Sequence, residues 1–201
     1  KNCQKISTMA SSMETEVPEE KKGEMKLVNV DFYGGTFALK IPDGLKDMSE
    51  VRQVPNHQEF YADVDKGMNV ITEINEYQSQ VSDEKINDFF FANLAKDTSA
   101  KLVQVFKKGK AEMPGAKDNF TSYIIGDHVV NERVDNRGPE LRVRVHMACI
   151  RLKSVTSDMV LIFTVPVKKQ FSNEENEVLT QTFFQMLEAF TIKSLAVFKG
   201  Q

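Results

Sequence analysis

Hydrophobic and polar positions along the chain fall into two kinds of pattern, one typical of strands and the other typical of helices. Alternating or short apolar runs bounded by glycine, proline and polar turns predict strands. These strands cover Met25–Phe32, Thr36–Lys40, Glu59–Val64, Met68–Tyr77, Asn119–Val130, Leu141–Val155 and Asp158–Val167. Residues 159–163 are apolar at every position, which is typical of a central strand buried on both faces.

Two segments have a helical pattern. In the first, Ser82 is expected to cap a helix. The apolar face of this helix is formed by Ile86, Phe89, Phe90 and Leu94. In the second, Ser172 and Glu175 have the spacing of a capping box, and apolar side chains recur on one face over residues 178–190.

Together these elements predict an α+β fold, in which helices pack on an antiparallel sheet of about six strands. Residues 107–118, KKGKAEMPGAKD, are interpreted as a basic, solvated loop. Residues 1–24 are rich in Ser, Thr, Glu and Lys and poor in large apolar side chains, so a disordered tail is expected there. A single domain is expected to follow over residues 25–201.

The composition narrows the class of protein. The chain has 201 residues, 41% hydrophobic and 27% charged, which is enough for one sizeable core. Its net charge of -3 disfavours nonspecific nucleic-acid binding and favours a partner with a basic patch. Cys3 and Cys149 are far apart, so a reducing compartment without a structural disulfide is expected. No apolar run approaches the length of a membrane span, so a soluble intracellular protein without a membrane partner is expected.

Candidate catalytic chemistry is sparse. His57, His128 and His146 lack the spacing of metal ligands, so no metal site is expected. Asp127 could orient the imidazole of His128, which keeps a hydrolase as a rival interpretation. Cys149 lies three residues from His146 on a predicted strand, so the two side chains should point to opposite faces. With no catalytic or nucleotide-binding motif in the sequence, we interpret the chain as a non-enzymatic protein without a cofactor.

Residues 32–61 combine a tight turn with a crowded, interrupted stretch of polar side chains. Gly34 and Gly35 separate an apolar run from an alternating one, which is the pattern of a hairpin turn. Proline and glycine then interrupt the backbone, while charged and amide side chains crowd residues 47–59. Because this segment is too short and too interrupted to bury them, it is interpreted as a docking surface rather than an active site.

Several motifs, taken in order, resemble one known family. They are F-Y-G-G-x-F from Phe32, I-P-x-G-x-x-D from Ile41, R-x-V-P-N-x-Q-E-F from Arg52, I-x-E-I-x-E from Ile71, and A-C-I-R-L-K from Ala148 followed by D-M-V-L-I-F-T-V-P-V from Asp158. This combination resembles the Ran guanine nucleotide release factor family, the Mog-type nuclear import factors, over about residues 32–167. The resemblance implies an α/β/α sandwich around an antiparallel sheet, shared with the photosystem PsbP proteins.

The resemblance also implies a function. The chain would be a monomeric, non-enzymatic partner of the small GTPase Ran that promotes loss of its bound nucleotide. It would support nuclear protein import in the nucleus and cytoplasm, where further nuclear transport factors are additional candidate partners. The implied Ran-binding residues are Asp47, Arg52, Asn56, Glu59, Glu73 and Glu76.

Two of these positions carry open alternatives. Arg52 either contacts Ran or braces the loop around it, and the same choice applies to Arg151. The family usually has aspartate where this chain has Asn56, and asparagine keeps hydrogen bonding and turn capping but carries no charge. A general protein-interaction adaptor of the same fold, without nucleotide-release activity, is the alternative function. A PsbP relative would need a transit or lumenal signal, and residues 1–24 lack the arginine-rich, acid-poor character of one.

Overall fold

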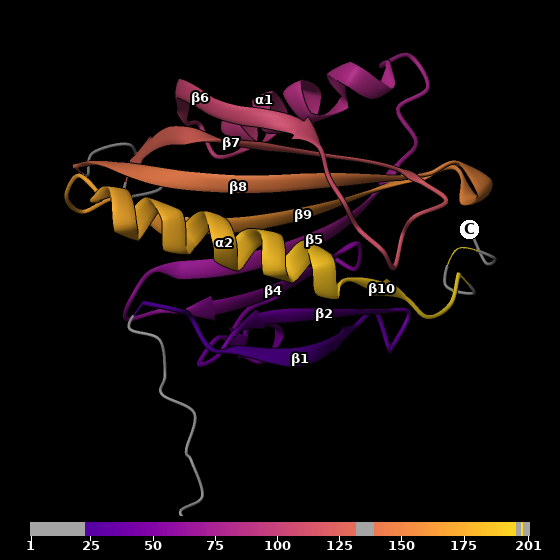
Figure 1. Cartoon of the computed structure of the whole chain (residues 1–201), viewed down its shortest axis with the longest axis horizontal. Coiled ribbons are helices and arrows are strands. Elements are labelled where there is room, and N and C mark those ends of the chain that lie inside the picture. The colour runs from indigo at the N-terminus through magenta and orange to yellow at the C-terminus, as the bar shows by residue number, and fades with distance from the viewer. Residues whose placement is uncertain (1–22, 132–138, 196–197, 199–201) are drawn as a thin grey trace, which may run out of the picture.

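A computed structural model describes residues 23–131, 139–195 and 198 of the chain (Figure 1). The tail predicted for residues 1–24 falls outside this part of the chain except for its last two residues. Within the described part, the elements form a central sheet with layers on both of its faces.

The central sheet of the described residues has seven antiparallel strands in the order β3-β4-β5-β9-β8-β7-β6. Their bounds are β3 (Lys46–Asp47), β4 (Gln58–Asp63), β5 (Met68–Glu76), β6 (Lys101–Lys110), β7 (Phe120–Asn131), β8 (Glu140–Leu152) and β9 (Ser157–Pro166). β9 pairs with β5 and β8, and its first seven residues are buried. The central, doubly buried strand predicted from the apolar run at residues 159–163 is therefore confirmed.

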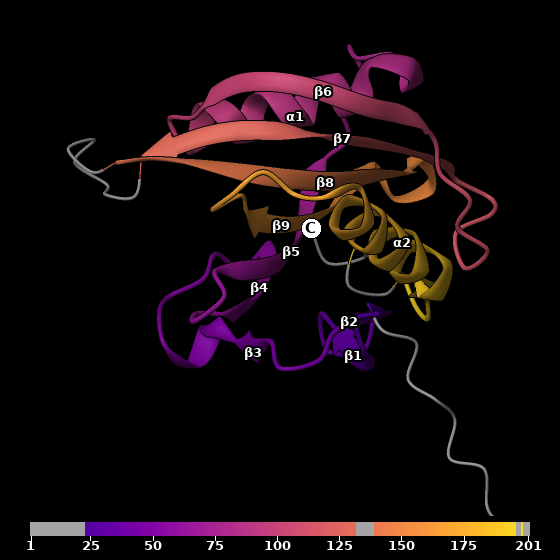
Figure 2. The ribbon, with the colours of Figure 1, turned by 60° about the vertical axis from the view of Figure 1, so that its left-hand side comes forward.

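The first predicted hairpin forms a small sheet of its own. β1 (Leu27–Phe32) and β2 (Phe37–Pro42) pair in antiparallel register, and β10 (Thr191–Ile192) adds a short third strand beside β2. Figure 2 shows this small sheet apart from the edge of the central sheet that carries β3 and β4. Its strands carry large apolar side chains such as Phe32 and Phe37, which are fully buried against the central sheet and α2 (Asn173–Ala189).

The two α-helices of the described chain cover opposite faces. α2 lies across the front of the sheet in Figure 1 and shares one core with the small sheet. α1 (Ile86–Asp97) packs on the other face against β7, β8 and β9. The predicted α+β class and the α/β/α sandwich are confirmed, and the structure adds that the strands divide between two sheets.

The helix ends differ in how well the sequence predicted them. The capping box of α2 is confirmed, because the Ser172 hydroxyl accepts from the Glu175 amide and the Glu175 carboxylate accepts from the Ser172 amide. Ser82 makes no side-chain cap and precedes the short 3-10 helix η2 (Asp83–Lys85), so α1 begins only at Ile86. The buried residues of α1 are Ile86, Asn87, Phe90, Phe91 and Ala95, whereas Phe89 and Leu94 are half-buried.

β6 is the long strand that the sequence pattern did not predict, and the two-residue strands β3 and β10 were not predicted either. Residues 107–110, interpreted as part of a loop, are the end of this strand, and only residues 111–119 connect it to β7. Two register shifts interrupt its pairing with β7, and its lysines and the partly exposed Phe106 lie at the sheet edge. Bulges and lysines are common at edge strands, and together they erased the alternation that would have predicted one.

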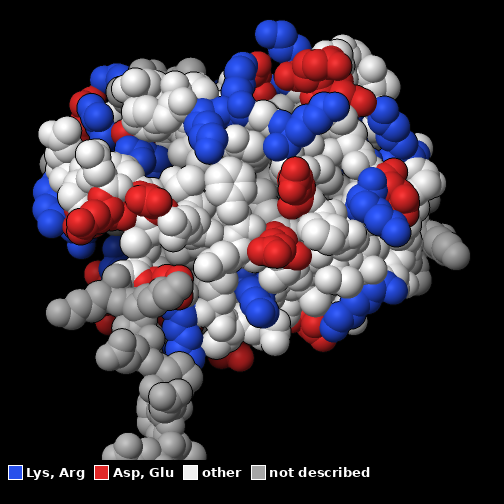
Figure 3. Space-filling model, in the orientation of Figure 1, with Lys and Arg blue, Asp and Glu red and all other residues white. Residues whose placement is uncertain are grey.

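None of the helices in the described ranges is long and apolar enough to cross a membrane. On the face shown in Figure 3, basic and acidic side chains are interspersed rather than gathered into one large patch of either sign.

Candidate protein-binding site

The hairpin tip between β1 and β2 connects the small sheet to the central one. Gly34 and Gly35 have φ of 62° and 86°, a region that glycine adopts without steric cost. Tyr33 precedes them with φ of 51°, which is uncommon for a residue with a side chain. The tip is closed by a hydrogen bond from the Gly35 amide to the Phe32 carbonyl. With this backbone shape, the Tyr33 ring packs edge-on against Phe37 of its own hairpin, and its hydroxyl reaches β4 and β5.

Tyr33 makes most of the polar contacts between the two sheets at this point. Its hydroxyl donates to the Thr72 carbonyl at 2.8 Å, with the His57 carbonyl also within reach at 3.1 Å, and accepts from the Thr72 hydroxyl at 3.2 Å. Its backbone amide donates to Oε1 of Glu59 at 2.6 Å. Burial raises the pKa of Tyr33 well above its usual value, so the ring remains a neutral anchor.

Glu59 is the least satisfied carboxylate of the predicted site. Its Oε1 accepts from Tyr33, but its Oε2 is buried without a hydrogen-bond partner. Burial raises the pKa of this carboxyl group, and the nearby charge of Asp47 raises it further. A buried carboxylate oxygen without a donor is costly. In this structure, Oε2 of Glu59 is therefore left with an unmet hydrogen bond.

Asp47 lies next to Glu59 on the same face of the sheet. It pairs in register with Tyr61, two positions along β4 from Glu59. Its carboxylate caps the short 3-10 helix η1 (Met48–Glu50) by accepting from the Ser49 amide at 2.8 Å. Asp47 is exposed, so it combines a structural bond with a free edge toward solvent.

Arg52 and Asn56 lie in the irregular segment between η1 and β4. The guanidinium carbon of Arg52 lies 4.4 Å from the centre of the Phe60 ring, a cation–π contact that braces the loop against β4. Asn56 is an exposed central residue of the turn closed by the hydrogen bond from the Gln58 amide to the Pro55 carbonyl. The contact favours the bracing interpretation of Arg52, while its exposed position also leaves it open to a partner.

Glu73 and Glu76 lie on β5 but in different settings. Glu73 is half-buried and accepts from Nε2 of Gln58 at 2.7 Å, and burial raises the pKa of its carboxyl group. Glu76 is exposed at the end of β5, beside Ser157. Glu73 is therefore a partly desolvated candidate for contact with a partner, and Glu76 is a hydrated one.

The predicted residues do not form a single cluster. Register places Glu59 opposite Thr72 and Gln58 opposite Glu73, so the side chains of Glu59 and Glu73 point to opposite faces of the sheet. Asp47 and Glu59 share the face of the small sheet, and Arg52 and Glu73 lie on the face covered by α1. Asp47 and Glu59 lie on β3 and β4 at the edge of the sheet, whereas Glu73 lies on β5, the next strand in from β4.

Tyr33 and Thr72 stabilise this site, but the sequence analysis did not name either of them as a candidate site residue. Tyr33 entered the sequence reasoning only as part of a motif, and Thr72 only as an interior strand residue. The signal for Tyr33 was its place directly before the two glycines of the hairpin turn. Nothing in the local sequence links Tyr33 with Thr72, since the two residues are 39 positions apart.

Tyr33→Phe is expected to lower the free energy of unfolding by about 1–2 kcal/mol, because the fully buried Thr72 hydroxyl and carbonyl lose their partner. Urea denaturation measures the change. Tyr77→Phe is the matched control, because the Tyr77 ring is held by its stack on Arg151 rather than by its hydroxyl. An equal loss in both variants would contradict the role given to the Tyr33 hydroxyl.

The rival catalytic groups are not brought together. Asp127 accepts from the Arg144 guanidinium, whereas the neighbouring His128 points to the other face of β7 and packs 4.4 Å from the Phe91 ring. His146 is fully buried between Phe163 and Phe183, and burial lowers its pKa to about 3. Asp127 therefore cannot orient the imidazole of His128.

Cys149 belongs to the α1 core, on the opposite face from His146, as the sequence predicted. Burial raises the pKa of its thiol, so the thiolate form is disfavoured. Among the described residues, no group of three or more His, Cys, Asp or Glu side chains is placed to hold a metal ion.

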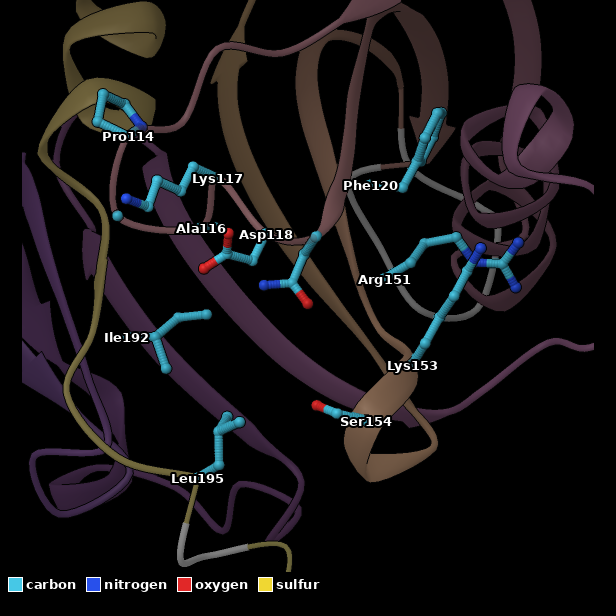
Figure 4. Close-up of a pocket in the computed structure, with 12 residues that line it drawn as sticks. Pro114, Ala116, Lys117, Asp118, Phe120, Arg151, Lys153, Ser154, Ile192 and Leu195 are labelled. Carbon is cyan, nitrogen blue, oxygen red and sulfur yellow. The ribbon is translucent and has the colours of Figure 1, made fainter.

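A cavity of about 650 Å³ lies between the loop after β6, the end of β8 and the segment after β10. Figure 4 shows Lys117 and Asp118 on one wall, with Arg151 and Lys153 on another. Two of its cations are already engaged: Arg151 near the end of β8 bonds Asp158 and Asp83, and Lys153, directly after β8, bonds Asp83. No function is assigned to this cavity.

The structure also decides whether Arg151 contacts a partner or braces its own surroundings. Its side chain is 1% exposed and donates to Asp158 at 3.2 Å, to Asp83 at 2.6 Å and to the Val81 and Gln78 carbonyls at 2.9 and 2.8 Å. The guanidinium also stacks on Tyr77. Arg151 thus braces the connection from β5 to α1 and is not a surface contact.

Comparisons with known proteins agree with this fold. The probable Ran guanine nucleotide release factor of Dictyostelium discoideum is 26% identical over 186 residues, covering 83% of this chain and 93% of that protein. The Saccharomyces cerevisiae Ran-binding protein Mog1p has a similar structure, with a TM-score of 0.64 at 20% identity over 84% of this chain and 96% of that one. Cyanobacterial PsbP from Synechocystis shares the fold with a TM-score of 0.56 at 9% identity, over 86% and 96% of the two chains.

A family model adds the decisive match. The model for the Ran-interacting Mog1 protein matches residues 30–166, which is more than half of the 201-residue chain. The matched region runs from within β1 through the candidate site to the end of β9. The chain belongs to the Ran-interacting Mog1 protein family.

Proposed function

We propose that this protein binds the small GTPase Ran and promotes release of its bound guanine nucleotide. The observation that carries the proposal is the half-buried Glu59 carboxylate, which has one oxygen without a partner at the edge of the sheet. The family match and a relative named a probable Ran guanine nucleotide release factor support Ran as the partner and nucleotide release as the outcome.

The mechanism follows from thermodynamic linkage and needs no covalent chemistry. A protein that binds nucleotide-free Ran more tightly than loaded Ran must weaken nucleotide binding by the same factor. A regulator of this kind contributes a surface rather than a catalytic group. The protein therefore acts as a non-catalytic GTPase regulator.

The carboxylates are the groups that would bind nucleotide-free Ran more tightly than loaded Ran. Glu59 and Glu73 are partly desolvated, so a basic group of Ran brought against either one gains more than at an exposed site. Basic groups that serve the nucleotide phosphates in loaded Ran become available when the nucleotide leaves. Glu59 and Glu73 would bind those groups in the nucleotide-free state.

A release assay tests the proposal directly. Ran loaded with a fluorescent guanine nucleotide is mixed with increasing amounts of the protein, and loss of the bound label is followed with time. We expect release that becomes faster with protein concentration, for at least one of the GDP and GTP forms. A stable complex with both forms and an unchanged release rate would instead support the adaptor function.

Glu73→Lys combined with Glu76→Lys is expected to weaken Ran binding by at least tenfold at low salt, because two attractive contacts on β5 become repulsive. The loss should shrink as salt is raised, since the hydrated Glu76 acts through screened charge. Titration calorimetry with Ran measures both effects. Glu112→Lys, an exposed charge reversal in the loop after β6, is the control. Unchanged affinity in a folded double variant would remove β5 from the binding surface.

We also propose that the protein acts as a monomer in the nucleus and cytoplasm, in support of nuclear protein import. Imaging of the tagged protein and import of a fluorescent cargo in depleted cells test this. Strict confinement to another compartment would refute the proposal.

A further inference from the structure

A groove runs along one side of α2, beside the start of the described chain (Figure 1). Its first hollow has a volume of about 620 Å³, and a second hollow of about 600 Å³ shares Met25 with the first. The α2 residues that line the two hollows include Glu174, Glu177, Val178, Gln181, Gln185 and Glu188. Because these residues recur three or four positions apart, they lie on one side of the helix and join the hollows into one groove.

The floor of the first hollow is apolar. It is formed by the half-buried Met25, Val165, Phe171 and Val178 and by the buried Leu179. A Cβ atom on Gly23 would lie 3.4 Å from Val178, which places the start of the described chain directly against α2. The half-buried side chains keep apolar surface in contact with water, and covering that surface is favourable.

A surplus of negative charge lies beside this floor. Glu174, Glu175 and Glu177 line the first hollow, and none of its described lining residues is a lysine or arginine. Glu175 is engaged by the Ser172 amide and by Lys169. Glu177 accepts from the neutral side-chain amide of Gln181 at 3.0 Å, and Glu174 is exposed. The helix dipole favours acidic residues in the first turn but fades beyond it, so it does not explain Glu177.

The shape of the groove suits a helix as its occupant. At the first hollow, the main chain of α2 is bonded within the helix, and Val165 of β9 pairs with Arg144 of β8. Strand addition has no free main chain to pair with there, whereas an apolar groove accepts the apolar face of a helix. The stripe from Glu174 to Glu188 is about 20 Å long, which matches almost four turns of a helix.

The groove is separate from the candidate Ran-binding residues. Thr72, which lies opposite Glu59, pairs with Leu161 of β9. Val165 lies roughly 13 Å further along the same strand. Its side chain packs with the core under α2, whereas Glu73 lies on the face covered by α1. A molecule in this groove therefore does not need to touch the Ran-binding residues.

We propose that this groove binds a cationic amphipathic helix of a second protein partner. The apolar side chains of that helix would cover Val165, Phe171 and Val178, and its lysines or arginines would face Glu174 and Glu177. The apolar floor supplies affinity, and the unneutralised carboxylates select a basic partner over an acidic one. This contact goes beyond the proposed function in Ran binding.

Fluorescence anisotropy with a labelled synthetic peptide tests the groove. The probe contains leucine and lysine, with its leucines three and four positions apart so that they form one apolar face. One control peptide has the same composition in scrambled order, and another has glutamate in place of lysine. We expect saturable binding of the probe by the full chain, and roughly tenfold or weaker binding of each control. No saturable binding, or equal binding of the scrambled peptide, would overturn the proposal.

Glu174→Lys combined with Glu177→Lys should weaken binding of the probe peptide roughly tenfold or more, because two attractive contacts become repulsive. Glu175, which caps α2, is left unchanged. Glu50→Lys combined with Glu84→Lys is the matched control, because it changes the net charge equally at exposed residues outside the groove. Equal weakening in the two double variants would show attraction to the overall charge and would contradict a binding site in the groove.

Val178→Asn tests the apolar floor without changing the charge. It should weaken binding of the probe peptide roughly tenfold, because apolar surface is lost from the contact. Val64→Asn, at a 77% exposed valine outside the groove, should leave the affinity unchanged. Circular dichroism checks that both variants are folded. Unchanged affinity in folded Val178→Asn would exclude this floor as the binding surface, and the paired glutamate variants decide the question if Val178→Asn does not fold.

Discussion

Glu59→Gln is expected to weaken Ran binding roughly 30-fold or more and to leave the free protein at least as stable at pH 7. Glutamine keeps an oxygen for the Tyr33 amide, so the contact between the two sheets survives. The amide, however, cannot pair with a basic group of Ran. Removing one partner of a desolvated charge pair typically costs 2–5 kcal/mol of binding free energy.

The effect of Glu59→Gln on the free energy of unfolding depends on pH in a defined direction. Burial raises the pKa of the Glu59 carboxyl group, so the folded protein holds this proton to a higher pH than the unfolded chain does. The contribution of Glu59 to the unfolding free energy therefore falls as pH rises from the usual carboxyl range through the raised pKa. Glu59→Gln lacks this loss, so the stability difference between variant and unchanged protein should grow in favour of the variant over that window.

Calorimetry with Ran and denaturant titrations at a series of pH values measure the two effects. Glu112→Gln, at an exposed carboxylate in the loop after β6, should change neither. If Glu59→Gln bound Ran as tightly as the unchanged protein, Glu59 would be only a support for Tyr33. If instead the variant were strongly destabilised at pH 7, the carboxylate charge itself would be holding the hairpin tip.

Arg151→Met is expected to give the largest loss of stability, about 3–5 kcal/mol, or roughly 6–20 °C in melting temperature. Asp158 is fully buried and would lose the guanidinium that lies 3.2 Å from it. The Gln78 and Val81 carbonyls would lose donors in the same change. The connection from β5 to α1 would thereby lose its brace.

Two further variants test whether the loss of stability in Arg151→Met comes from the unpaired buried charge of Asp158 or from a nonspecific effect of the substitution. Lys153→Met removes an exposed cation that contacts the same Asp83, and its effect should be much smaller. Adding Asp158→Leu to Arg151→Met should restore part of the loss, because the stranded charge disappears with its partner. Thermal unfolding of the three variants measures this. Equal destabilisation by Lys153→Met and Arg151→Met would show that the buried pair is not the source.

Local pattern was enough to predict most of the fold. The apolar run of β9, the capping box of α2 and the two glycines of the first hairpin each encode their element within a few residues. β6 was missed because bulges and edge lysines break its alternation. The separate small sheet could not be predicted, because packing of the hairpin against α2 depends on contacts between distant segments.

The sequence predicted which segments contain the candidate site, but it did not predict how the side chains of the site are arranged in space. The motifs indicated which carboxylates to consider, yet register alone decides that Glu59 and Glu73 point to opposite faces. The orientation of Tyr33 toward Thr72 likewise arises from the positive φ at the hairpin tip. Whether a given glutamate is exposed or partly desolvated is set by neighbours that are distant in sequence.

The central claim is that this protein binds nucleotide-free Ran more tightly than loaded Ran. The most direct test is to measure its affinity for nucleotide-free, GDP-loaded and GTP-loaded Ran under the same salt conditions by titration calorimetry. We predict the highest affinity for nucleotide-free Ran, with a ratio equal to the factor by which the protein weakens nucleotide binding. Equal affinities for all three forms would contradict the account, because no release could then follow from binding.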